Sequence, residues 1–158
     1  MATTVESATL TVTVKEAITL NKHDYGASHT LTIASVTEIA KRIVEIPTSE
    51  IIFLVFQATN PGAGTFDKAD PRYIRITNLD DTNFVQLTFR DSNSTEFAIK
   101  LDAGHSCFYI PDNSGGVVST MIASGSALSV PSTFADLVDI TAVADSGAVD
   151  IEYYVAGV

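Results

Sequence analysis

Apolar and polar residues alternate along most of the chain, and turn-forming residues separate the alternating runs. Leu10, Val12 and Val14 alternate with threonines, and the same two-residue period returns in residues 85–90 and 97–102. Because successive side chains of a strand point to opposite faces, each run predicts a strand with one apolar and one polar face. We therefore expect the chain to be built from β-strands.

The predicted strands are short and number roughly ten or eleven. They cover residues 9–20, 28–35, 51–57, 72–78, 83–90, 96–101, 105–110, 117–123, 137–144 and 148–155. Residues 36–46 fit a helical face as well as a strand, and the β-branched sequence before Pro47 favours the strand. Residues 21–26 are predicted to form a turn, and residues 59–71 and 124–133 the two long loops.

The spacing of the strands predicts an all-β fold of two packed antiparallel sheets, a β-sandwich with jelly-roll connectivity as the leading option. Short turns between the four runs of residues 72–110 predict a meander of neighbouring strands. With 158 residues, the chain has the size of one domain. We expect residues 1–158 to form a single β-sandwich domain, in which residues 1–8 are a candidate extended arm.

The composition narrows the classes of partner. A formal net charge of −10 disfavours direct binding to nucleic acid, because a phosphate backbone requires clustered cations. No run approaches the ~20 apolar residues of a membrane-spanning helix, so we expect no membrane partner. The first residues lack the basic and apolar segments of a secretory signal, and synthesis in a cytoplasm is expected. Cys107 is the only cysteine and is expected to fill a place in the core.

The residues that usually carry chemistry do not form a recognisable constellation. His23 and His29 flank one turn, and His105 lies two residues before Cys107, but neither pair supplies the three or four ligands of a zinc site. Residues 80–83 are rich in oxygen atoms yet lack the calcium-loop pattern, which favours a side-chain-capped turn. We therefore expect a protein that is not an enzyme, with no catalytic, cofactor-binding or metal-ligating residues and no cofactor.

Aromatic residues offer an alternative function. A set of them is a candidate sugar-stacking platform for a carbohydrate-binding module: Tyr25, Phe66, Tyr73, Tyr109, Tyr153 and Tyr154. Because Tyr153 and Tyr154 are adjacent in a predicted strand, they must point to opposite faces, and at least one is expected in the core.

Several stretches, taken together, carry a resemblance that spans most of the chain. They are residues 9–21, 41–50, 72–85, 97–104 and 114–118. In these strand and turn sequences the chain resembles a group of small virion-associated proteins of tailed bacteriophages, especially marine and cyanobacterial ones. The resemblance implies a β-rich structural protein of the particle, of the capsid decoration or cement type, with head–tail and fibre positions as alternatives.

A cement protein of this kind would be made in the host cytoplasm and lie on the capsid surface of the virion. Its expected partners are the major capsid protein and copies of itself, as a homo-oligomer held by many weak sites on a symmetric lattice. The candidate contact elements are residues 59–71, 124–133 and 2–10. The alternative is an adhesin or carbohydrate-binding module of a fibre or tail, for which a glycan is the partner.

Overall fold

The computed structural model describes residues 4–57, 62, 64–122 and 133–158, and these residues confirm the all-β prediction. Thirteen strands and no helix occur in these ranges. The strands are β1 (Ala8–Glu16), β2 (Thr19–Leu20), β3 (His23–Asp24), β4 (Ala27–Val36), β5 (Glu38–Ile46), β6 (Ile51–Gln57), β7 (Thr65–Asp67), β8 (Pro71–Asn78), β9 (Val85–Asp91), β10 (Glu96–Leu101), β11 (Ser106–Tyr109), β12 (Leu137–Ala144) and β13 (Val149–Gly157). Residues 36–46 are extended, as the β-branched pattern before Pro47 predicts.

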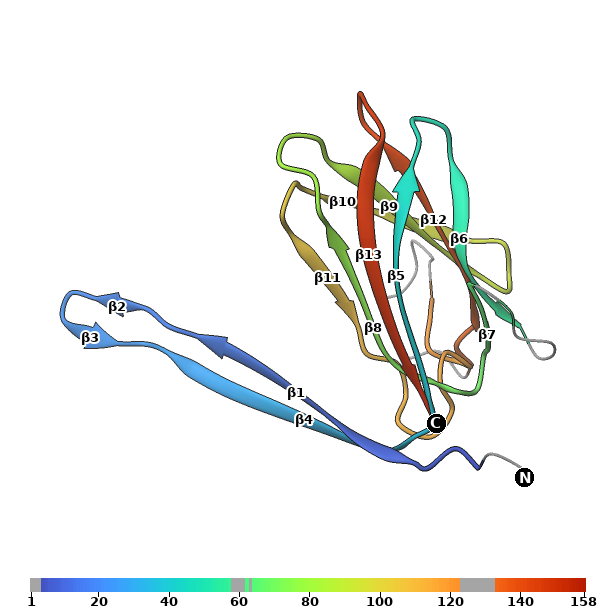
Figure 1. Ribbon diagram of the computed structural model, residues 1–158, viewed down its shortest axis with the longest axis horizontal. Helices are drawn as coiled ribbons and strands as arrows, with labels where there is room; N and C mark the ends of the chain where they lie inside the picture. The colour runs from blue at the N-terminus through green and yellow to red at the C-terminus, as the bar shows by residue number, and fades with distance from the viewer. Residues whose placement is uncertain (1–3, 58–61, 63, 123–132) are drawn as a thin grey trace.

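Two sheets packed face to face form the body of the molecule (Figure 1). The sheet nearer the viewer, here the front sheet, has the strand order β11-β8-β13-β5. The back sheet has the order β10-β9-β12-β6-β7 and is antiparallel except for the β6–β7 pair. The predicted two-sheet sandwich is therefore confirmed.

The sandwich strands pair in a nested order. β5 pairs with β13, β6 with β12, β8 with β11 and β9 with β10, and successive pairs alternate between the front and back sheets. The meander predicted for residues 72–110 is thus wrong, because the chain crosses to the back sheet after β8 and returns for β11. The buried Asn78 side chain holds this crossing, donating to the carbonyl oxygens of Asn83 at 2.9 Å and Leu101 at 3.2 Å.

The strand predicted for residues 117–123 is also wrong over residues 117–122, and residue 123 lies outside the described part. This segment makes a single bridge, from Met121 to Ala135, instead of a ladder. Its backbone bonds other segments: the Val117 N–H donates to the Lys68 carbonyl, and the Leu137 N–H donates to the Val117 carbonyl. Its apolar side chains close the lower end of the core, which explains why their pattern resembles that of a strand.

The core lies between the two sheets and contains the inward side chains of both. Tyr153 is its largest fully buried residue, with its ring 6.2 Å from that of Phe53, while Tyr154 lies on the outer face of the front sheet. The prediction that these two tyrosines point to opposite faces is confirmed.

A cluster of ion pairs centred on Arg90 lies on the outer face of the back sheet. The guanidinium lies 2.5 Å from the Glu50 carboxylate, 3.0 Å from that of Glu96 and 3.8 Å from that of Asp139. Burial raises the pKa of Asp139, although the positive charge of Arg90 opposes this, and Asp139 Oδ1 has no hydrogen-bond partner among the described residues. At neutral pH the Asp139 charge is therefore a small cost to folding.

Replacing Asp139 by asparagine is expected to stabilise the protein at pH 7 by about 1 kcal/mol or less. The pKa of Asp139 is higher in the folded protein than in the unfolded chain. The wild-type protein therefore loses stability as the pH rises from the ordinary pKa of an aspartate through the pKa of Asp139 in the folded state. The gain should accordingly shrink to nothing at about pH 3, where both side chains are neutral. Urea unfolding at the two pH values measures this gain, with Glu38→Gln as control, because Glu38 is exposed and lies outside the Arg90 cluster. A destabilised Asp139→Asn variant at pH 7 would show that the Arg90 pair outweighs desolvation.

Candidate interaction surface

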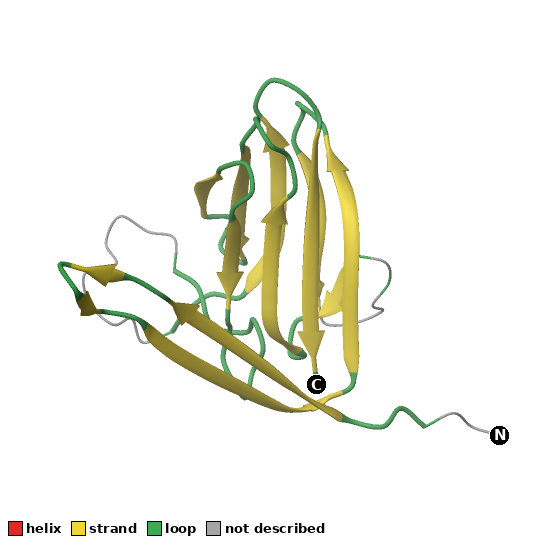
Figure 2. Ribbon diagram, turned by 60° about the vertical axis from the view of Figure 1, so that its left-hand side comes forward, coloured by secondary structure: helices red, strands yellow, loops and turns green. Residues whose placement is uncertain are grey.

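Strands β1 to β4 form a hairpin arm that leaves the lower end of the sandwich and projects past it (Figures 1 and 2). β1 pairs with β4, β2 with β3, and a hydrogen bond from Tyr25 N to Ile18 O continues the same register between them. Asn21 and Lys22 form the turn with φ angles of 51° and 68°, which match a two-residue hairpin turn of type I′. The projecting part, for which residues 1–8 were the candidate, is thus a hairpin that runs to Val36.

The arm has two chemically different faces, because its alternating sequence is paired in one register. Threonines face one another on one side, where the Thr13 and Thr30 hydroxyls lie 3.3 Å apart. The other side is an apolar stripe, interrupted by Glu16 and accompanied by two exposed histidines. Its apolar members are Leu10, Val12, Val14, Ile18 and Leu20 on the outgoing strands and Tyr25, Leu31 and Ile33 on the returning ones.

The base of the stripe is docked on the outer face of the front sheet. Ile33 and Val36 are buried against Tyr73 of β8 and Ala156 of β13, and Tyr154 packs at the margin of this cluster. An amphipathic ribbon gains stability only where its apolar face is covered, so this contact anchors the arm.

A β-bulge at the base sets the direction of the arm. Ala8 pairs with Val36 and Leu10 with Ile33, so two residues of β4, Ala34 and Ser35, oppose one residue of β1. Ser35 has a φ of 60°, in the left-handed region that an extra bulge residue can occupy. The ribbon therefore turns away from the line of β5 immediately before that strand begins.

Beyond the sandwich the stripe has no cover from the described residues. Val14 is 44% exposed, and Tyr25 near the tip is 63% exposed. A two-stranded hairpin alone is marginally stable in water, and a row of exposed apolar residues on one is typical of an interaction surface. The distal half of the arm is therefore our candidate interaction surface.

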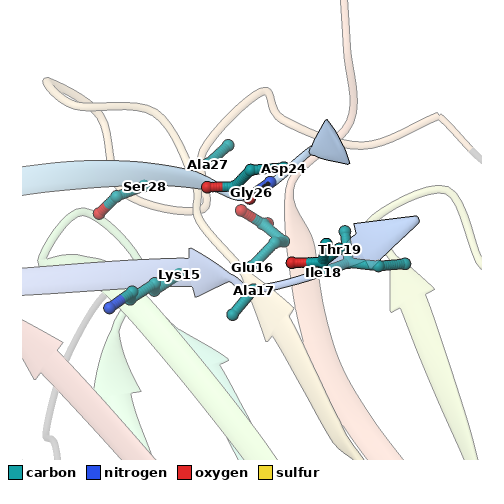
Figure 3. Close-up of a pocket in the computed structure, with 9 residues that line it drawn as sticks. All are labelled: Lys15, Glu16, Ala17, Ile18, Thr19, Asp24, Gly26, Ala27 and Ser28. Carbon is teal, nitrogen blue, oxygen red and sulfur yellow. Dashed lines mark hydrogen bonds between the residues drawn. The ribbon is translucent and has the colours of Figure 1, made fainter. Parts of the chain in front are cut away.

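An open hollow of about 590 Å³ lies where the ribbon bends between the β1–β4 and β2–β3 pairs (Figure 3). It is lined by Lys15, Glu16, Ala17, Ile18, Thr19, Asp24, Gly26, Ala27 and Ser28. The Gly26 N–H donates to Asp24 Oδ1 at 2.8 Å, and a Cβ at Gly26 would lie 2.8 Å from the Glu16 carbonyl oxygen. The hollow is thus the bend of a narrow ribbon, with no second layer of protein to enclose a ligand.

The residues considered for chemistry lie apart from one another. His23 and His29 are exposed on the arm, and His105 is exposed in the turn before β11. Cys107 is half-buried against the core, and burial raises the pKa of its thiol. Among the described residues, no group of three or more His, Cys, Asp or Glu side chains is placed to hold a metal ion. The same residues contain no helix long and apolar enough to cross a membrane.

Asp80 caps its own turn, as residues 80–83 predict. Its Oδ1 accepts hydrogen bonds from the backbone N–H groups of Thr82 at 2.7 Å and Asn83 at 2.6 Å. These bonds, of which the one from Asn83 has the largest effect, lower the pKa of the Asp80 carboxyl.

The six aromatic residues of the candidate sugar platform are not brought together. Phe66 and Tyr153 are in the core, and Tyr109 packs against it. Tyr73 and Tyr154 lie in the cluster at the base of the arm, and Tyr25 is near its tip.

The structure describes the three predicted contact segments to different extents. Of the two predicted long loops, residues 59–61 and 63 of the first and residues 124–132 of the second lie outside the described residues. The loop prediction is wrong over residues 65–67, which form strand β7. Residues 8–10 belong to β1 and enter the arm. The arm is longer than the segment 2–10 predicted as a candidate contact element, although the alternation from Leu10 to Leu20 and the turn at Asn21 were sequence signals of its length.

Charge is distributed unevenly between the arm and the sandwich. Residues 1–37 contain two lysines and three acidic residues, so this segment carries −1 of the formal charge of −10 and the rest of the chain carries −9. At the end of the sandwich away from the arm, four carboxylates surround a hollow of about 370 Å³: Glu45, Asp80, Asp81 and Asp150. The arm is thus repelled less than the sandwich by another acidic molecule.

Comparisons with protein-family models, with curated proteins and with solved structures give no match to this chain.

Proposed function

We propose that this protein is a non-enzymatic structural protein of a tailed-phage virion, a decoration or cement protein on the outer surface of the capsid. It binds the major capsid protein and its own copies, and it stabilises the seams between subunits. The phage assignment comes from the resemblance of the strand and turn sequences described above. The nested pairing of the sandwich strands, which we interpret as jelly-roll connectivity, is compatible with it.

The observation that carries this proposal is the amphipathic arm with its exposed distal stripe. An arm that reaches beyond its own sandwich is suited to cross a seam, and its apolar residues gain free energy only when another molecule covers them. One such contact is weak, but many copies on a symmetric lattice add their contacts through avidity. The acidic far end of the sandwich is suited to face solvent.

Phage particles that lack the protein test the proposal. We expect cryo-electron microscopy to show density missing at regular positions on the outer capsid, and heating to release the genome at a lower temperature. Purified protein should restore both, and the Ile18→Ser variant should restore them poorly. Ile52→Ser is the matched control, because Ile52 lies on the back sheet and is 54% exposed, against 55% for Ile18. Particles with unchanged surface density and unchanged heat resistance would reject the cement role.

The exposed ring of Tyr25 near the tip of the arm favours a second candidate, a fibre or tail adhesin that stacks a sugar on this ring. A glycan array distinguishes the two. If the protein is an adhesin, the wild type binds a defined glycan and the Tyr25→Ala variant does not. If it is a cement protein, neither binds a glycan.

A further inference from the structure

One stretch of the arm's stripe has an apolar, acidic, apolar pattern. Val14, Glu16 and Ile18 recur every second residue, and all three are exposed. Among the ion pairs of the described residues, none involves Glu16. This segment therefore offers two exposed apolar side chains and one carboxylate without an ion-pair partner on the same side of the ribbon.

The edge strand of the front sheet has the complementary pattern. Ala40 and Val44 of β5 pack against the core, so Ile39, Lys41 and Ile43 point outward from the same strand. These three residues are exposed and follow the order apolar, basic, apolar. Lys41 Nζ lies 3.1 Å from Glu152, and an ammonium group has three donors, which leaves it able to bind a second carboxylate.

The two patterns have the same spacing and opposite charges. With Glu16 placed against Lys41, either strand direction brings an apolar residue of the arm onto each of the two β5 isoleucines. The outer face of the front sheet already accepts this stripe at the base of the arm, where Ile33 packs against Tyr73. The new contact is therefore of a kind that the fold already uses.

The arm cannot make this contact with its own chain. It leaves the sandwich on the side of β11, whereas β5 is the opposite edge of the front sheet (Figure 1). A second copy supplies the missing surface, and a closed ring of copies would use every arm and every β5 once. Because the sandwich carries −9 and the arm −1, contacts made through arms also avoid the repulsion between two acidic bodies.

The geometry points to an arm-exchanged oligomer, in which residues 14–18 of one copy dock on the outer face of β5 in a second copy, Glu16 against Lys41. This inference rests on the proposed function only in taking the arm as the contact element. Its test uses the purified full chain without capsids, so the arm-exchanged oligomer and the cement role can fail separately.

Analytical ultracentrifugation over a range of concentrations is the first measurement. We expect wild-type protein to self-associate, and Ile18→Ser and Ile43→Ser each to weaken association about tenfold, because each loses one buried apolar side chain. The Ile52→Ser control should change it less than about twofold. Thermal unfolding of each variant verifies that the sandwich is intact.

Charge reversal tests whether the arm of one copy docks on β5 of a second copy. Glu16→Lys and Lys41→Glu should each weaken association about fivefold, and the double variant should recover the wild-type value. Lack of recovery in a correctly folded double variant would overturn the pairing. A wild-type chain that stays monomeric, yet needs Ile18 to bind particles, would also overturn it, because the arm would then dock on a capsid protein and the cement role would stand.

Discussion

Gly116→Ala is expected to lower the free energy of unfolding by about 3 to 5 kcal/mol. Gly116 has a φ of 61°, which costs an alanine about 1 to 2 kcal/mol, and an added Cβ would lie 2.4 Å from the Lys68 carbonyl oxygen and 2.6 Å from the Ala69 carbonyl carbon. Both neighbours are backbone atoms, and the Lys68 carbonyl also accepts the Val117 N–H at 2.8 Å. The segment that closes the core therefore cannot move aside without losing this hydrogen bond.

Gly104→Ala is the matched control, because Gly104 has a φ of 72° but nothing lies within 4 Å of an added Cβ. We expect it to cost about 1 to 2 kcal/mol, the cost of the backbone angle alone. Urea unfolding of the two variants measures the difference. Equal losses would show that the crowding around Gly116 relaxes at no cost.

Arg72→Met is expected to cost about 2 to 4 kcal/mol. The buried Arg72 Nη1 donates to the carbonyl oxygens of Ala69 at 2.6 Å, Asp70 at 3.0 Å and Pro71 at 3.2 Å. Methionine fills a similar volume but removes this donor from the Ala69 and Pro71 carbonyls, whereas the Asp70 carbonyl still accepts the Val158 N–H at 3.1 Å. A carbonyl that is buried and left unsatisfied is costly.

Arg42→Met is the control for Arg72→Met, because Arg42 is exposed on β5 and should cost less than about 0.5 kcal/mol. Arg72→Lys should fall between wild type and Arg72→Met, since one ammonium group cannot copy the planar guanidinium. A loss in Arg72→Met as small as that in Arg42→Met would mean that water replaces the guanidinium.

The sequence predicts the strands well because a two-residue period reports which side chains share a face. It does not report which strands become neighbours, so the short turns of residues 72–110 suggested a meander where the chain in fact crosses between sheets. Asn78 makes this crossing possible through bonds to Asn83 and Leu101, one of which reaches 23 residues along the chain. Val117 and Met121 show the same limit, since they are apolar to close the core rather than to form a ladder.

The candidate surface was harder to predict than the fold. Leu10 and Leu20 belong to the same alternating pattern, but only Leu10 has the front sheet beneath it. Their difference in exposure depends on where the sandwich ends relative to the ribbon, which is a property of tertiary structure. Local alternation contains no information about it.

The bulge at Ser35 lies at the base of the arm, so a small change of angle there moves the tip of the arm over a larger distance. From Leu10 to Leu20 the extended chain spans roughly 33 Å, so a rotation of about 10° at its foot displaces the tip by about 6 Å. If the arm binds a neighbouring molecule, as proposed above, the backbone angle at this one position sets the distance at which the arm reaches it. If the proposed capsid role holds, subunits of a curved shell meet at several slightly different angles, and small changes at this one bend would let the same chain fit each of them with the sandwich left unchanged.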